Sequence, residues 1–429
     1  MNKWKKLAAT GVTFAAVTLL AACGGGSKTE SKGSKTELNW YTPTEIITLD
    51  ISKNTDRYSA TAIGNSGSNL LRAGEAGKLN EDLAEKVDVS ADGLTYTATL
   101  RDGLKWSDGS DLTAEDFVYS WQRIADPKTA SEYAYLVSEA NVLNADEVIA
   151  GTKPVEELGV KADGNKVIFT LSAPAPQFMS LLSFSNLAPQ SKAFVEKVGD
   201  EYGTASDKQI YSGPFTVEDW NGTSGSFKLV KNENYWDAKN VKLETVNFET
   251  VKKPDTAVQM YKQGELDFAT ISDTPAIYNA NKKNEDVVPV KEATTAYIVY
   301  NQTGSVPALT NTKIRQALNL ATNREGVVEA AVNTGSVAAT GFAPSGLASL
   351  TDGTDLAEFV APGYKYDEAE AAKLFKEGLE EAGVSEVTLT VTADADRPAA
   401  KAAVDYLKET WEKALPGLKI EEKFVTFKQ

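Results

Sequence analysis

The chain has 429 residues, a formal net charge of −16, a single cysteine and no histidine. The acid excess argues against a nucleic-acid partner, because nucleic acid attracts clustered positive charge. The lack of histidine excludes Ser-His-Asp and Cys-His catalysis and the usual zinc ligand sets. Nothing in the spacing of the 60 acidic residues singles out a catalytic carboxylate pair. We therefore expect neither an enzyme nor a cofactor or metal site.

The first 22 residues have the pattern of an export signal. Three lysines within the first six residues precede an apolar run from Leu7 to Leu20, and small residues follow. A basic start, an apolar stretch and a small-residue cleavage zone are typical of such signals. The apolar run is shorter than the roughly 20 residues that span a bilayer. We predict a signal peptide over residues 1–22.

The single cysteine, Cys23, follows Leu20, Ala21 and Ala22. This arrangement resembles the bacterial lipobox, in which the cysteine thiol is lipidated and the chain is cut just before it. The alternatives are a chance cysteine behind an ordinary secretory peptide, or a reactive or intermolecularly paired thiol. Residues 23–36 are rich in Gly, Ser, Thr, Lys and Glu, so they cannot bury enough surface to fold. We predict a flexible tether behind a lipid (palmitate) anchor.

The first elements after the tether mix strands and helices. Residues 37–50 open as a strand that turns at Pro43, and residues 90–106 alternate apolar and polar side chains between two Asp-Gly pairs. Period-two alternation predicts a half-buried strand bounded by turns. Thr113 lies three residues before Asp116, a spacing that predicts a capping box and a helix start. The apolar residues of this helix at helical spacing are Phe117, Trp121 and Ile124.

The middle of the chain continues this alternation. Residues 166–183 predict a strand, a break at two prolines and an apolar helix. Residues 212–232 predict two strands around Asn221-Gly222, which is a hairpin signal. Residues 255–271 predict a helix that ends near Gly264 and runs into a strand.

The last part of the chain is the most regular. A strand is predicted over 294–304, followed by one helix over 311–332. A further helix stops at Gly383, where glycine is favoured as a C-terminal cap. A strand, a helix with Pro398 in its first turn, and a final strand complete the pattern. A strand–helix–strand unit of this size implies parallel pairing and a right-handed crossover.

The sequence DGLTYTATLRDGLKWSDGSDLTAEDFVYSWQR (92–123) strongly resembles the signature of peptide-binding lipoproteins of bacterial ABC importers. This is the oligopeptide/dipeptide-binding class, solute-binding protein family 5. Further stretches match the family in the same order: SGPFTVEDW (212–220), NENYWD (232–237), YKQGELD (261–267), YNQT with IRQALNLATNRE (300–325) and YDEAEAAKLFKEG (366–378). Ordered matches are more specific than any single motif, and the resemblance covers residues 37–429.

The resemblance implies an α/β, two-lobed periplasmic-binding-protein-like fold of class II type with an extra inserted domain. A discontinuous first-lobe domain would comprise residues 37–70 and 208–286, with the inserted domain at 71–207. Residues 287–429 would form the second lobe. Members of the family continue beyond the point at which this sequence stops, so the second lobe is expected to be incomplete.

The function that the resemblance implies is a surface-anchored receptor. It would bind extended peptides between its lobes, pairing with their backbone as an added strand, and deliver them to an ABC peptide permease. The expected partners are therefore peptides, ABC permease subunits and, through the lipid anchor, the membrane. We expect a monomer at the cell membrane, facing outside the cytoplasm, with no nucleic-acid partner.

Candidate site residues also come from the resemblance. Relatives contact peptide backbone from the loop after the first strand and from a tyrosine shortly after the signature helix. The implied residues are Asp56, Arg57, Tyr58, Ser59, Tyr133, Tyr135 and, on a strand end, Asn301. The two tyrosines would share a face in a strand and diverge in a helix, and ordinary packing explains them equally well. Trp106 and Trp121 are expected in the core.

Two other functions stay open from the sequence. A receptor of the same fold could capture a peptide pheromone for sensing, and a non-transport surface protein such as an adhesin or chaperone could use the same scaffold. Nickel- and haem-binding relatives rely on His or Met. The absence of histidine and the presence of only three methionines argue against those ligands.

Overall fold

The computed structural model describes residues 35–74, 78–272, 275–290, 292, 294–331, 335–350, 352–360, 363 and 365–426. The predicted signal peptide, Cys23 and all but the last two residues of the predicted tether lie outside the described residues. Among the residues described, none of the helices combines the length and the apolar character needed to cross a bilayer.

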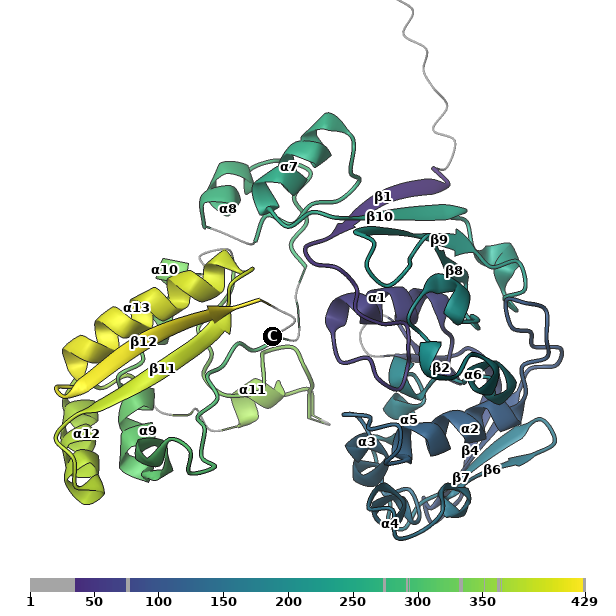
Figure 1. Cartoon of the computed structure of the whole chain (residues 1–429), viewed down its shortest axis with the longest axis horizontal. Helices are drawn as coiled ribbons and strands as arrows, with labels where there is room; N and C mark the ends of the chain where they lie inside the picture. Colours follow the sequence, from purple (N-terminus) through teal and green to yellow (C-terminus); the bar gives the residue numbers. More distant parts are fainter. Residues whose placement is uncertain are drawn as a thin grey trace, which may run out of the picture.

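The described chain forms two lobes, which Figure 1 shows side by side. The N-terminal lobe (35–272) contains two four-stranded sheets, and the C-terminal lobe (294–426) contains a two-stranded sheet covered by helices. Helix α8 (Pro275–Asn281) lies beside α7 (Pro254–Gln263) at one end of the molecule, between the lobes in this view. The architecture is mixed α/β, as predicted.

One sheet of the N-terminal lobe joins the start of the chain to strands much later in the sequence. Its order is β1 (Glu37–Thr42), β10 (Thr245–Thr250), β9 (Ser226–Lys231) and β8 (Phe215–Glu218). β1 pairs with β10 in parallel, and the other pairs are antiparallel. β8 and β9 form the predicted hairpin around Asn221-Gly222, with Gly222 at φ +90°. Phe227 and Phe248 stack at 4.5 Å in the core beneath the sheet.

The second sheet is antiparallel and carries helix α2 (Ala114–Ala125). Its order is β4 (Ala84–Val89), β5 (Thr95–Leu100), β7 (Lys166–Thr170) and β6 (Val160–Asp163). The predicted alternation in β5 and the capping box of Thr113 and Asp116 are confirmed. Trp121 is fully buried, 4.8 Å from the ring of Phe169, and Trp106 is buried too. Both tryptophans are core residues, as expected.

Short elements complete this lobe. They are β2 (Leu71–Ala73), β3 (Leu79–Glu81), α1 (Arg57–Ser66), α3 (Tyr135–Glu139), α4 (Ala145–Ile149), α5 (Phe178–Leu181) and α6 (Lys192–Val198). Single 3-10 turns lie at Val155–Glu157, Ser185–Leu187, Gly199–Glu201, Ser206–Lys208 and Ala238–Asn240.

In the C-terminal lobe, β11 (Val387–Asp394) and β12 (Leu418–Val425) pair in parallel across α13 (Pro398–Ala414), as the sequence predicted. Gly383 at φ +69° ends α12 (Glu368–Ala382), and Pro398 is the first residue of α13. The other helices are α9 (Thr312–Leu320), α10 (Arg324–Ala331), α11 (Leu356–Phe359) and a 3-10 turn at Pro307–Thr310. The core packs around Phe375, Leu407 and Trp411.

Three sequence-based elements were wrong. Residues 294–304 alternate like a strand but form no ladder with any described strand, so the alternation has no partner to stabilise it. The residues after Gly264 likewise form no strand. A single hydrogen bond, from the Asp267 amide to the Asn39 carbonyl at 2.8 Å, joins them to β1. The single helix over 311–332 is two helices. Asn323 interrupts it, because its side-chain oxygen accepts from the Gly326 amide and caps α10.

Candidate ligand-binding site

The predicted residues 56–59 form a first cluster at the start of α1. Two of them, Asp56 and Ser59, make hydrogen bonds that hold the helix in place. The Asp56 carboxylate accepts hydrogen bonds from the amides of Tyr58 and Ser59 at 2.9 and 2.8 Å. The Ser59 hydroxyl is fully buried and accepts from the Ile47 amide at 2.8 Å. A capping aspartate and a buried serine fix the helix in place and leave little polar surface for a ligand.

Arg57 is the exposed member of this cluster, whereas Tyr58 is half-buried and packs against the core of the lobe. The Arg57 side chain is 62% exposed, and its guanidinium lies 5.7 Å from the centroid of the Tyr58 ring. It also reaches Glu292, with 3.6 Å between the two charged groups. Glu292 lies on the segment that leads into the C-terminal lobe, so this ion pair connects α1 to that segment. Exposed pairs of this kind contribute little and exchange readily.

Tyr133 lies in a turn and Tyr135 is the first residue of α3, yet their rings are neighbours. The ring centroids of Tyr133 and Tyr135 are 6.1 Å apart. Tyr133 is half-buried against the edge of Phe184 at 5.7 Å, and burial raises the pKa of its phenol. Tyr135 is 52% exposed. Of this pair, Tyr135 exposes its aromatic surface to solvent, and the half-buried ring of Tyr133 packs beside it.

Asn301 lies in the C-terminal lobe, away from any strand. Its side-chain oxygen accepts from the Thr303 amide at 3.0 Å and from the Thr303 hydroxyl at 2.8 Å. Both bonds close a local turn, and neither links Asn301 to α1 or to the tyrosines. The expectation that this residue ends a strand was wrong, for the reason given for residues 294–304.

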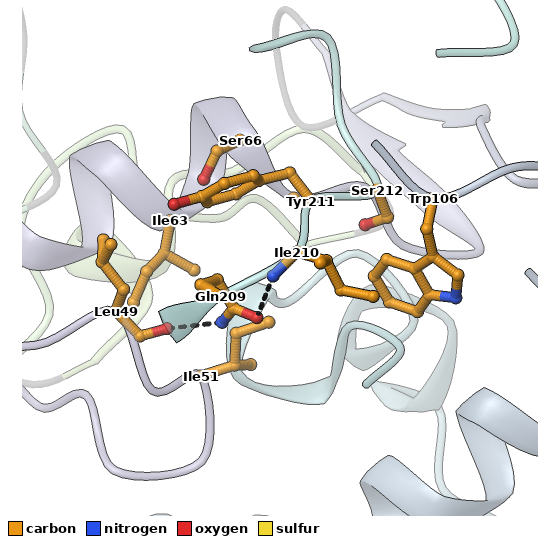
Figure 2. Close-up of a pocket in the computed structure, with 10 residues that line it drawn as sticks. Leu49, Ile51, Ile63, Ser66, Trp106, Gln209, Ile210, Tyr211 and Ser212 are labelled. Carbon is orange, nitrogen blue, oxygen red and sulfur yellow. Dashed lines mark hydrogen bonds between the residues drawn. The ribbon is translucent and has the colours of Figure 1, made fainter. Parts of the chain in front are cut away.

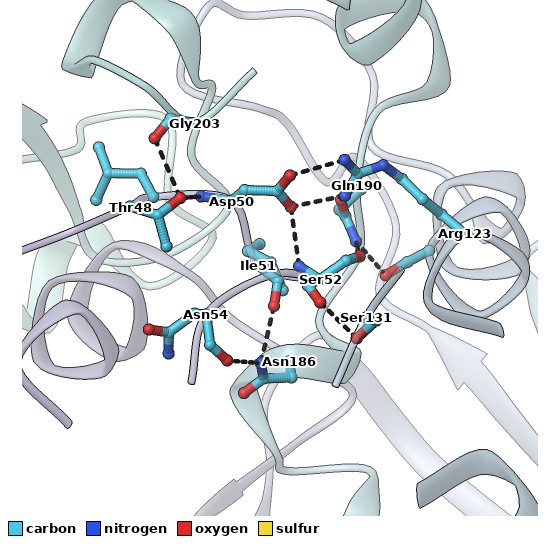
Figure 3. A network of polar contacts seen from close by, with 12 residues as sticks. Thr48, Asp50, Ile51, Ser52, Asn54, Arg123, Ser131, Asn186, Gln190 and Gly203 are labelled. Atoms are coloured by element: carbon cyan, nitrogen blue, oxygen red, sulfur yellow. Dashed lines mark hydrogen bonds and ion pairs between the residues drawn. The ribbon is translucent and has the colours of Figure 1, made fainter. Parts of the chain in front are cut away.

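A buried polar network under α1 was missed by the sequence reasoning (Figure 3). Asp50 and Arg123 form a bidentate pair, with oxygen–nitrogen distances of 2.7 and 2.8 Å. Arg123 also donates to Gln190 at 2.8 Å, and Asn186 lies in the same network. The partners are far apart in sequence, which hides them from local patterns. The available signal was the presence of two amides, Asn186 and Gln190, inside the largely apolar stretch LLSFSNLAPQ (181–190).

Two cavities of the described structure differ in size and place. The cavity in Figure 2 has a volume of about 10 Å³, room for about one water molecule. Gln209 crosses it, donating to the Leu49 carbonyl and accepting from the Ile210 amide, both at 2.9 Å. A hollow of about 250 Å³ in the C-terminal lobe is lined by Glu325, Val328, Glu329 and Ala338. Within the described ranges, no group of three or more acidic, His or Cys side chains is placed to hold a metal.

Comparisons with known proteins match nearly the whole chain. The chain is 43% identical to a dipeptide-binding protein of Lactococcus lactis subsp. cremoris, over 96% of this chain and 75% of the relative. Two solved structures align over 92% of the chain. They are Listeria monocytogenes OppA bound to peptide (33% identity, TM-score 0.86, 78% of that chain) and the substrate-binding domain of an oligopeptide ABC transporter from Bacillus anthracis (35%, 0.81, 76%).

The chain thus spans about three quarters of the length of these relatives. Their two-lobed fold is the fold of this chain. Residues 78–429 match the model of the bacterial extracellular solute-binding proteins, family 5 Middle. A match over this much of the chain, on the same two-lobed architecture, establishes that the protein belongs to family 5 of the bacterial extracellular solute-binding proteins.

Proposed function

We propose that this protein is a receptor that binds extended peptides between its two lobes and delivers them to an ABC peptide permease. The observation that carries the proposal is the alignment of 92% of the chain, at a TM-score of 0.86, with a family member bound to peptide. The dipeptide-binding relative at 43% identity supports the same ligand class. Hydrogen bonds to peptide backbone are independent of side-chain identity, so such a receptor accepts varied sequences.

The ligand-contacting residues that we propose lie at the margin of the N-terminal lobe. Arg57 and Tyr135 offer exposed side chains there, and Tyr58 offers the accessible part of a half-buried ring. Asp56 and Ser59 hold the start of α1 through hydrogen bonds to backbone amides. Tyr133 acts through its contact with Tyr135. For Asn301, on the other lobe, we propose a contact made when the lobes enclose the peptide.

We also propose the domain division that the sequence suggested. Residues 37–70 and 208–286 would form the discontinuous first-lobe domain, 71–207 the inserted domain and 287–429 the second lobe. The pairing of β1 with β10 in one sheet supports the discontinuous domain. The second antiparallel sheet, which lies wholly within residues 84–170, supports the insert.

The protein would work at the outer face of the cell membrane as a monomer, held by a lipid on Cys23 and a flexible tether. The lipobox-like sequence before Cys23 supports this proposal. Labelling of the chain by radioactive palmitate that is lost in a Cys23→Ser variant would support the anchor. A chain that takes up no label would refute it.

The ligand class is tested by titrating the chain with synthetic tripeptides to octapeptides in a calorimeter. We expect saturable binding with one peptide per chain, and we expect the bound peptides to be recovered intact by mass spectrometry. Recovery of cleaved peptides would reveal a hydrolase. No saturable heat with any peptide, while the Lactococcus relative responds, would favour a non-transport surface protein.

A further inference from the structure

The loop that leads into α1 is clamped by the neighbouring part of the lobe. The Asn186 side-chain amide donates to two carbonyls of this loop, those of Ile51 at 2.9 Å and Asn54 at 2.8 Å. Asn186 is only 3% exposed. Because buried carbonyls must be hydrogen-bonded, these two hydrogen bonds fix the course of the chain just before Asp56.

Ser131 connects the same loop to the tyrosines. Its hydroxyl donates to the Ser52 carbonyl at 2.5 Å and accepts from the Tyr133 amide at 3.2 Å. One hydroxyl therefore bridges the approach to α1 and the turn that carries Tyr133 and Tyr135. Figure 3 shows Ser131 beside Ser52, with a dashed line marking the hydrogen bond between them.

A second connection runs in parallel through Phe184. This residue precedes Asn186 by two positions, and its ring packs edge-to-face with that of Tyr133, with 5.7 Å between the ring centroids. The segment 184–186 thus touches the tyrosine turn with a ring and the α1 loop with an amide. The two connections together restrain both the distance and the orientation between the two groups of candidate residues.

The base of the network is a buried ion pair. The carboxylate of Asp50 and the guanidinium of Arg123 are 4% and 13% exposed. Gln190 extends the pair by donating to the hydroxyls of Ser52 at 2.8 Å and Ser120 at 2.9 Å. Bidentate charged hydrogen bonds have strict geometry, so they give the loop one position.

We propose that Ser131 and Asn186 are positioning residues that set the separation between Arg57 and Tyr58 on one side and Tyr135 on the other. This inference rests on the proposed function, since it treats these groups as contacts for a peptide. A site held in its binding geometry before the ligand arrives loses less entropy on binding. The network thereby contributes to affinity without touching the peptide.

The test compares two serine-to-alanine variants of the full chain, purified in detergent. Ser131→Ala removes the bridge. Ser206→Ala is the matched control, because Ser206 is also half-buried and donates to one carbonyl, that of Trp220 at 3.0 Å, away from the candidate residues. The probes are the synthetic tripeptides to octapeptides used above. Affinity is measured by calorimetry, and melting temperature by scanning calorimetry.

We expect Ser131→Ala to raise the Kd by up to about fivefold, because binding must then restore the order that the hydroxyl maintains in the free chain; this ratio corresponds to one ordinary hydrogen bond. Ser206→Ala removes one hydrogen bond where Ser131→Ala removes two, so it should lower the melting temperature by a smaller amount and leave the Kd unchanged. Ser131→Thr keeps the hydroxyl and should restore the affinity, whereas Ser131→Cys, with a weak donor, should fall between. Hydrogen exchange of residues 50–59 should quicken in Ser131→Ala and not in Ser206→Ala.

An unchanged Kd in Ser131→Ala, with the unsubstituted chain binding normally, would overturn the positioning role alone. An equal loss of affinity in Ser206→Ala would also overturn it, because the effect would then follow stability. Failure of the unsubstituted chain to bind any of the probes would overturn the proposed function, and the inference with it.

Discussion

The two lobes differ in how completely their side chains are covered. In the N-terminal lobe, a buried ion pair and a set of satisfied amides hold the loop before α1. In the C-terminal lobe, Val299, Phe342 and Phe359 are 77%, 71% and 65% exposed. Apolar surface left in water contributes no hydrophobic stabilisation. We therefore expect the N-terminal lobe to hold the more rigid half of the candidate site, and the described part of the C-terminal lobe to be the less stable of the two.

The largest loss of stability should follow from truncating a buried tryptophan in the core of each lobe. Trp121→Ala should lower the free energy of unfolding of the N-terminal lobe by about 3–5 kcal/mol, because the fully buried ring packs on Phe169 and Phe178. The matched change in the other lobe is Trp411→Ala. Hydrogen exchange read by mass spectrometry in urea reports each lobe separately. Each change should destabilise its own lobe alone. Equal destabilisation of both lobes by either change would show that the two lobes unfold together.

A smaller loss should follow from Asp50→Asn. The change leaves the guanidinium of Arg123 buried without its charged partner, which should cost about 3 kcal/mol. The control is Asp111→Asn, which breaks the exposed pair with Lys105 and should change stability little. Urea unfolding of the N-terminal lobe measures both. Equal effects would contradict the assignment of the buried pair as a main restraint of this lobe.

Tyr235→Phe should have a pH-dependent effect of about 1 kcal/mol at neutral pH, because the phenol donates to Asp82 at 3.0 Å. Burial, together with the charge of Asp82, raises the pKa of Tyr235 to about 12. The unfolded phenol ionises near pH 10, so the hydroxyl stabilises the fold fully below that pH. Its contribution should disappear as the pH rises through 12. A difference between wild type and variant that is constant from pH 8 to 12 would refute this assignment.

The smallest effects should be equal in the two lobes. Gly264 ends α7 at φ +77° and Gly383 ends α12 at φ +69°, and a Cβ at either position would meet no atom within 4 Å. Substitution by alanine should therefore cost only the left-handed backbone conformation, about 1 kcal/mol at each position. Asparagine should cost less than alanine. Unequal losses, measured by urea unfolding of each lobe, would show that packing contributes at one of the two caps.

The sequence predicted the elements whose signals are local. The alternation in β5 and the capping box of α2 were correct, because each depends on residue spacing within one short segment. The parallel pair β11 and β12 was also correct, because consecutive strand, helix and strand signals imply a crossover connection. The strand expected at 294–304 failed, since a strand also needs a partner that local alternation cannot supply.

The candidate site was predicted less completely than the fold. The family resemblance indicated the start of α1 and the two tyrosines, but it did not separate exposed side chains from structural ones. Asp56 turned out to be a helix cap, and Ser59 is fully buried. The network that connects the two groups depends on contacts such as that between Asp50 and Arg123, 73 residues apart. Such contacts follow from the tertiary fold and from no periodicity in the sequence.

We propose that peptide binds at the margin of the N-terminal lobe formed by α1 and the turn that carries Tyr133 and Tyr135. The most direct test is calorimetric titration of the unsubstituted chain and Tyr135→Ala with the tightest-binding synthetic peptide. Because Tyr135 is 52% exposed, its removal should leave the fold intact. We expect saturable binding that becomes about tenfold weaker in the variant, as for an aromatic contact at an interface. Equal affinity in the two proteins would show that peptide does not bind at this margin.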